Sequence, residues 1–224
     1  MGEVSEAYSE CRARIASLTS GLDDRVAAVR VPTCPQWSVH DVVAHVSGVV
    51  DDVLAGRLDG IATEPWTAAQ VDARRARPIV EMLAEWNTGA AVFETMLDAA
   101  GNTGRQAVAD LVTHEHDIRA ALREPGARDS SAVRIGVGFV ADAFVGINAN
   151  SGISARVCTS DGAEFGAPDA SVVLTGDSFE ILRAMTGRRS IDQLRELEWQ
   201  GDVESVLPSF TFGPFVPAAQ RIEE

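Results

Sequence analysis

The sequence predicts an α+β protein in which an antiparallel bundle of the four-helix type, over residues 1–150, precedes a small α+β domain over residues 151–224. Three observations lead to this prediction. Segments before residue 150 repeat apolar residues at helical spacing and are joined by short loops, as in helix bundles. Beyond that point short β-branched runs alternate with Gly-containing turns. The length, 224 residues, is sufficient for two domains with buried cores.

The bundle is expected to begin with a helix from Glu3 to Leu22, in which apolar side chains recur at helical spacing. A connector with two prolines follows at residues 29–35. Ser38 and Asp41 then resemble a capping box, with Asp in place of the usual Glu, and they predict the start of a second helix. Gly56 is the expected end of that helix.

Thr67 and Gln70 suggest another capping box at the start of a third helical segment, which Pro78 interrupts or restarts. This segment continues to Gly101. The next helix lies within residues 104–126, where a Pro-Gly pair closes it. These segments supply the central helices of the predicted bundle.

A further helix at about residues 131–148 is rich in small and apolar residues, so we expect a buried helix of the bundle. In the second domain, residues 155–166 predict a β-hairpin and residues 170–176 a β-branched strand. A helix capped by Asp177 or Ser178 follows that strand. Residues 195–200 alternate in polarity and predict a last strand.

Composition and charge exclude several classes of function. The formal net charge of −14 argues against binding of nucleic acid or of an anionic membrane surface. The sequence has no run of 18 apolar residues that would predict a transmembrane helix, and its start lacks the apolar run of a signal peptide. Three widely spaced cysteines fit reduced thiols better than a disulfide framework. We therefore expect a cytoplasmic protein.

Asp110 and His114 are the first candidates for a metal site. His114 falls within an apolar helical stripe, and Asp110 lies one turn before it. Side chains four residues apart on a helix have Cβ atoms about 5–6 Å apart, so both can point at one atom. The pair is therefore half of a metal site, in a stripe that also contains Leu111, Ile118, Ala121 and Leu122.

The remaining histidines divide by helical face. His116 points nearly opposite to His114, where we expect a solvated side chain, and His40 points away from the apolar stripe of its helix. His45 lies at the edge of that stripe and could be either a ligand or a hydrogen-bonded core residue. Asp117 returns to the side of His114, where it either orients the imidazole or is an ordinary surface carboxylate.

The motifs around these residues resemble a known family. Trp37 precedes S-V-H-D-V-V-A-H-V, and a later helix contains Asp-x-x-x-His-x-x-Asp followed by I-R-A-A-L. This combination resembles the mycothiol-dependent maleylpyruvate isomerase family, whose members are similar to DinB-like metal-binding four-helix bundles. The segment V-V-L-T-G-D-S-F-E-I-L-R-A-M-T-G-R-R-S also resembles, weakly, the small C-terminal domain of that family.

The resemblance implies a divalent metal, typically zinc, held by His45, Asp110 and His114. The family more often has Glu at the position of Asp110. Because Asp is one methylene shorter, either the helix lies closer to the metal or this ligand is lost. The implied activity is that of an enzyme that activates mycothiol as co-substrate, for thiol transfer or for cis-trans isomerisation of a small electrophile such as maleylpyruvate.

Arg188 and Arg189 are candidates for binding a carboxylate of the substrate, because guanidinium groups bind carboxylates through paired hydrogen bonds. The alternative is that they are ordinary cations near the C-terminus of a helix. Two other functions stay open: a hydrolase that uses a metal-bound water, and a non-catalytic binding or regulatory module whose metal site is weak or vacant. The sequence leaves open the substrate, the metal and the oligomeric state, for which a homodimer is one option.

Overall fold

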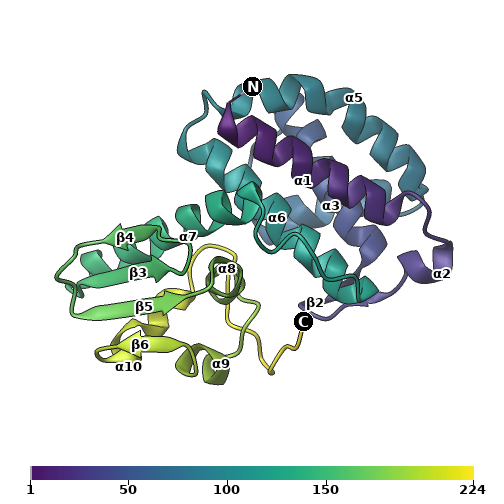
Figure 1. Cartoon of the computed structure of the whole chain (residues 1–224). Helices are drawn as coiled ribbons and strands as arrows, with labels where there is room; N and C mark the ends of the chain where they lie inside the picture. Colours follow the sequence, from purple (N-terminus) through teal and green to yellow (C-terminus); the bar gives the residue numbers. More distant parts are fainter. Residues whose placement is uncertain (1) are drawn as a thin grey trace. The chain divides into compact units, whose positions relative to one another are not determined.

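The computed structural model describes residues 2–224 and divides them into two compact units (Figure 1). The first contains the chain up to Gly126 together with Glu224, and the second contains Ala127–Glu223. The first unit is mainly helical, and the larger sheet belongs to the second. The predicted α+β class is confirmed.

Four long helices make up the core of the first unit. They contact one another pairwise as in a four-helix bundle, with α4 packed on α3. A short antiparallel pair, β1 with β2, precedes α3 where the sequence suggested only a connector. The elements are α1 (Glu3–Thr19), α2 (Asp24–Ala27), β1 (Arg30–Val31), β2 (Cys34–Ser38), α3 (Val39–Leu54), α4 (Glu64–Arg74), α5 (Ile79–Leu97) and α6 (Asn102–Leu122).

The two predicted capping boxes differ in outcome. Ser38 and Asp41 form one, since each side chain accepts a hydrogen bond from the backbone N–H of the other. By contrast, α4 begins earlier than expected, after Thr63, and has Pro65 in its first turn. Gln70 is therefore a mid-helix residue, and it is buried.

The central part of α6 is buried on all sides, because α1, α3, α5 and β1 all contact this helix. Every residue from Leu111 to Ile118 is buried. The expectation of a solvated His116 is therefore wrong, since its side chain is only 3% exposed. Helical periodicity correctly separates the two faces of α6 but does not reveal that both are covered.

The second unit contains a mixed four-stranded sheet in the order β4-β3-β5-β6. The hairpin β3–β4 is confirmed, β5 runs parallel to β3, and β6 pairs antiparallel with β5. Asp177 caps α8 as predicted. The elements are α7 (Ser131–Asn150), β3 (Ala155–Thr159), β4 (Glu164–Gly166), β5 (Val172–Gly176), α8 (Ser178–Met185), α9 (Ile191–Arg195), β6 (Glu198–Gln200), α10 (Val203–Val206) and the 3-10 helix η1 (Leu207–Phe210).

Helix α7 packs against α8, β3 and β4, and it belongs to the second unit instead of the bundle. The division between the units follows Gly126, whereas the sequence placed the domain boundary at residue 150. Among residues 2–224, α7 is the one helix with the length and composition to cross a membrane, and half of its most apolar stretch is buried within the protein. Its small apolar residues predict burial without indicating the partner.

Candidate metal centre

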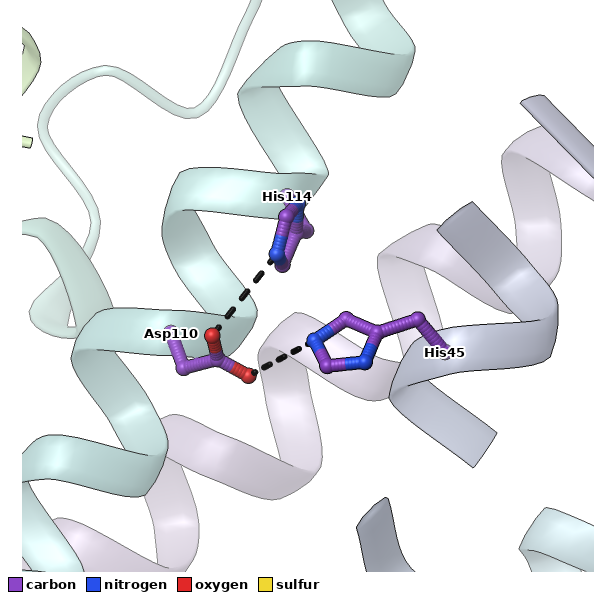
Figure 2. Close-up of side chains that lie close together, drawn as sticks. All are labelled: His45, Asp110 and His114. Carbon is purple, nitrogen blue, oxygen red and sulfur yellow. Dashed lines mark ion pairs between the residues drawn. The ribbon is translucent and has the colours of Figure 1, made fainter. Parts of the chain in front are cut away.

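The side chains of His45, Asp110 and His114 converge in the first unit (Figure 2). One potential ligand atom from each residue lies within 4.8 Å of the other two. The Asp110 carboxylate bridges the imidazoles, with 3.6 Å from Oδ2 to His45 Nε2 and 3.6 Å from Oδ1 to His114 Nε2. Helix α3 and helix α6 thus bring together the three residues that the sequence suggested as ligands.

The other ring nitrogen of each histidine faces a hydrogen-bond acceptor. His114 Nδ1 lies 3.1 Å from Asp117 Oδ2, and His45 Nδ1 lies 2.7 Å from Gln70 Oε1. A neutral imidazole has one N–H, and these contacts place it on Nδ1 in both rings. Each Nε2 then directs its lone pair toward Asp110, as metal ligation requires.

Asp117 is itself held in place by the turn between β1 and β2. The Thr33 hydroxyl donates to Asp117 Oδ1 at 2.7 Å, and the Cys34 thiol lies 3.8 Å from Oδ2. Asp117 is completely buried. The contact to His114 is the one expected for an orienting carboxylate, and the strand pair that the sequence did not predict positions it.

Trp37, on β2, covers the imidazoles. Its ring centroid lies 5.2 Å from that of His45 and 5.8 Å from that of His114, and the latter pair is stacked. The two histidines are 4% and 7% exposed, whereas 42% of the Asp110 side chain is accessible. The cluster is therefore accessible to solvent on the side of Asp110.

This donor set fits a divalent metal such as zinc, which accepts imidazole nitrogen and carboxylate oxygen. Ligands about 2.0–2.1 Å from a tetrahedral zinc lie roughly 3.4 Å apart, close to the 3.6 Å between Asp110 and each imidazole. Three protein ligands also leave a fourth position for a small molecule. Although Asp is one methylene shorter than Glu, the Asp110 carboxylate reaches both imidazoles, because α3 and α6 lie close together at this point.

The other predicted residues lie elsewhere. His40 donates from Nε2 to the Arg77 carbonyl at 2.8 Å, so it points away from the cluster as expected. Arg188 and Arg189 belong to the second unit and are largely buried. Arg189 pairs with Glu180 at 2.8 Å, and Arg188 donates to the Thr186 carbonyl. The structure thus shows structural partners for both arginines.

A second buried carboxylate lies on α6 next to His114. Glu115 is completely buried and accepts hydrogen bonds from Arg14 at 2.8 Å, from Arg119 at 2.9 Å and from the Cys11 thiol at 3.0 Å. Burial raises the pKa of Glu115, but the bonds from Arg14 and Cys11 outweigh it and lower this pKa below its ordinary value. Burial and the adjacent Glu115 raise the pKa of Cys11.

Comparisons with solved structures show the fold. The chain is similar to a mutant of the mycothiol-dependent maleylpyruvate isomerase, with a TM-score of 0.57 and 10% identity over 83% of this chain and 88% of that chain. A second structure of the mycothiol-dependent maleylpyruvate isomerase gives a TM-score of 0.50 and 11% identity, with the same coverage. No curated protein matches the sequence.

A family model described as the mycothiol maleylpyruvate isomerase N-terminal domain matches residues 8–127. The matched segment includes His45, Asp110 and His114, together with the hydrogen-bond partners of both imidazoles, Gln70 and Asp117. It also covers more than half of the 224 residues. The chain therefore belongs to the mycothiol maleylpyruvate isomerase N-terminal domain family.

Proposed function

We propose that this protein is a metal-dependent cytoplasmic enzyme that uses mycothiol to isomerise a small, electrophilic, maleylpyruvate-like substrate. The observation that carries the proposal is the convergence of His45, Asp110 and His114, with both imidazoles oriented through Nδ1. The choice of thiol and substrate is supported by membership of the family and by similarity to structures of the mycothiol-dependent maleylpyruvate isomerase.

His45, Asp110 and His114 would hold the metal, for which we propose zinc. When bound, the metal lowers the pKa of a coordinated thiol, so that a thiolate is present at neutral pH. Asp117 and Gln70 keep the Nε2 lone pairs directed into the site. Trp37 covers the imidazoles, which leaves the side of Asp110 for entry of the thiol and the substrate.

Isomerisation requires no oxidant or reductant. The thiolate sulfur forms a C–S bond with one carbon of the conjugated double bond, and the electron pair moves onto the conjugated carbonyl. Rotation about the resulting single bond follows. The double bond then re-forms as the C–S bond breaks, and the thiol is returned. Thiol transfer would be the outcome if the α-carbon of the adduct takes up a proton from water and the adduct is released with its C–S bond intact.

Arg188 and Arg189 remain our proposed partners for a carboxylate of the substrate. Arg189 would have to exchange its present partner, Glu180, for the substrate. Arg188 would have to redirect a guanidinium that now donates to a backbone carbonyl. In both cases the guanidinium would exchange one oxygen acceptor, a carboxylate or a backbone carbonyl, for a carboxylate oxygen of the substrate.

The test is elemental analysis of the purified protein after incubation with zinc. We expect about one zinc per chain in the wild type and none in His114→Ala. His40→Ala is the matched control, because His40 is a half-buried histidine of the same unit that lies outside the cluster. Retention of zinc in this control would exclude non-specific binding by histidine.

Activity is then measured with maleylpyruvate in the presence and absence of mycothiol. We expect turnover that depends on the thiol and is lost in His114→Ala. Absence of metal in the wild type would overturn the proposal in favour of a binding or regulatory module. Turnover of other substrates that continues without any thiol would identify a metal-water hydrolase instead.

A further inference from the structure

Gln70, on α4, is part of a chain of hydrogen-bonded polar side chains that runs from His45 to Asp52 and Arg57. Its side chain is only 2% exposed. The amide oxygen accepts from His45 Nδ1 at 2.7 Å, and the amide nitrogen donates to Asp52 Oδ2 at 2.7 Å. Arg57 donates to the other oxygen of Asp52 at 2.8 Å. Both ends of a buried amide are thus bonded.

The direction of this chain is fixed by its acidic end. An ionised carboxylate only accepts hydrogen bonds, so the amide nitrogen of Gln70 must face Asp52. The amide oxygen therefore faces His45 and can only accept. It follows that His45 must carry its proton on Nδ1 and that its Nε2 lone pair points toward Asp110.

A glycine on α3 makes room for this contact. Gly48 lies three residues after His45, on the same side of the helix. A Cβ atom added there would lie 2.7 Å from Cβ and 2.9 Å from Cγ of Gln70, closer than such atoms approach one another. Glycine weakens a helix interior, so its place in the middle of α3 indicates a packing role.

We infer that Gln70 is a positioning residue of the metal site and that Gly48 provides the notch in which it lies. In this role Gln70 selects the tautomer of His45, as Asp117 does for His114. A neutral amide therefore supports one imidazole and a carboxylate supports the other. The inference rests on the proposed function, because positioning has a purpose only if the Nε2 atoms bind a metal.

The first experiment needs no metal. Long-range proton–nitrogen NMR spectra of the metal-free protein, at mildly alkaline pH, distinguish the two tautomers of each histidine. We expect His45 in the Nδ1–H form in the wild type and a shift toward the Nε2–H form in Gln70→Met, which keeps the length of the side chain and loses the acceptor. His114 should stay unchanged, because its acceptor is Asp117.

The second experiment measures zinc affinity by competition with a chelator. We expect Gln70→Met to bind zinc roughly 10–100-fold more weakly, the usual effect of removing an orienting partner. The matched control is Gln193→Met, in the second unit, which removes another buried glutamine whose amide oxygen and nitrogen are both hydrogen-bonded. Its zinc affinity should equal that of the wild type.

A charge-conserving double variant tests whether hydrogen bonding, and not shape, is responsible. In Asp52→Asn/Gln70→Glu the new carboxylate accepts from His45, and the new amide donates to it while still accepting from Arg57. Net charge is unchanged. We expect this variant to bind zinc at least as tightly as the wild type, whereas Gln70→Glu alone places two carboxylates together and should bind more weakly.

Gly48→Ala provides an independent variant. Alanine is the better helix former, so helix propensity predicts no harm, but the overlap with Gln70 predicts weaker zinc binding and a changed His45 tautomer. A wild-type tautomer and an affinity within about twofold in Gln70→Met, against the 10–100-fold usual for orienting partners, would overturn the inference. Should that variant not fold, Gly48→Ala and the double variant give the same decision.

The two proposals fail in different ways. If the wild type binds no zinc, the proposed function fails, and the tautomer of His45 still shows whether Gln70 selects it. If the wild type binds zinc and Gln70→Met changes neither tautomer nor affinity, only the role of Gln70 fails.

Discussion

Two carboxylates of α6, five residues apart, have opposite surroundings. Glu115 is completely buried, and its oxygens accept from Arg14, Arg119 and Cys11. Asp110 is partly exposed, and its oxygens face the Nε2 atoms of His45 and His114. In both rings the proton lies on Nδ1, which donates to Gln70 or to Asp117. Proton donors around the first make it a structural ion cluster. The two Nε2 atoms beside the second are the arrangement on which the proposed metal site rests.

The largest effect on stability is expected from Glu115→Gln. This change leaves Arg14 and Arg119 without their shared anion, and breaking a buried ion pair costs about 3–5 kcal/mol. Because 24% of the Arg14 side chain is accessible and can regain water, we expect a loss near 3 kcal/mol, at the low end of that range. Urea unfolding measures it. Retention of wild-type zinc affinity by the folded fraction would complete the contrast.

Asp110→Asn makes the same carboxylate-to-amide change on the same helix, but we expect it to weaken zinc binding and to leave stability nearly unchanged. Removal of a proposed ligand should lower zinc affinity by more than about 100-fold, beyond the 10–100-fold typical of orienting partners. The unfolding free energy should change by less than about 0.5 kcal/mol, as at other accessible positions. Asp110→Glu is the control, since it keeps the carboxylate and should keep zinc. Equal loss of stability in Asp110→Asn and Glu115→Gln would refute the distinction.

The contribution of Glu115 to the unfolding free energy should depend on pH in the acidic range. The pKa of Glu115 is lowered in the folded protein, so its contribution to stability is complete above the unfolded pKa of about 4.3 and is lost as pH falls through the folded value. The difference in unfolding free energy between wild type and Glu115→Gln should therefore shrink as the pH falls below the unfolded pKa and through the lower folded pKa. Other carboxylates are common to both proteins and cancel. A constant difference would contradict the assignment.

Within the Glu115 cluster, a smaller loss of stability than that of Glu115→Gln is expected at Cys11. Cys11→Ala removes one of several donors to Glu115 and should cost about 1 kcal/mol. Burial and the adjacent carboxylate raise the pKa of this thiol, which keeps it protonated and slow to react. In native protein, mass spectrometry after alkylation should find Cys34 and Cys158, both half-buried, labelled before Cys11. Labelling of all three thiols at one rate would show that the buried cluster around Glu115 is accessible to the reagent.

Local periodicity explains what could be predicted of the site. Asp110 and His114 share a face because four residues make about one helical turn, and His45 lies beside the apolar stripe of α3, a helix that contacts α6. These relations depend on one helix at a time. The donor atoms of His45, Asp110 and His114 come together when α3 packs against α6.

Tertiary contacts explain what could not be predicted. Gln70 lies 25 residues from His45, and a glutamine on a helix has no pattern that marks it as a partner. The strand pair that holds Asp117 contains only two residues on one side, and its prolines suggest a loop. Helix α7 has the composition of a buried helix in either unit.

Trp37 has a further consequence, since its indole lies against both imidazoles. The fluorescence of an indole is quenched by a paramagnetic ion close to it. Cobalt or nickel in the cluster should therefore dim Trp37 in proportion to the fraction of sites filled. Substitution of Trp37 by phenylalanine would remove that response while Trp66, Trp86 and Trp199 still emit. The fluorescence of Trp37 would thus report metal binding at His45, Asp110 and His114 directly.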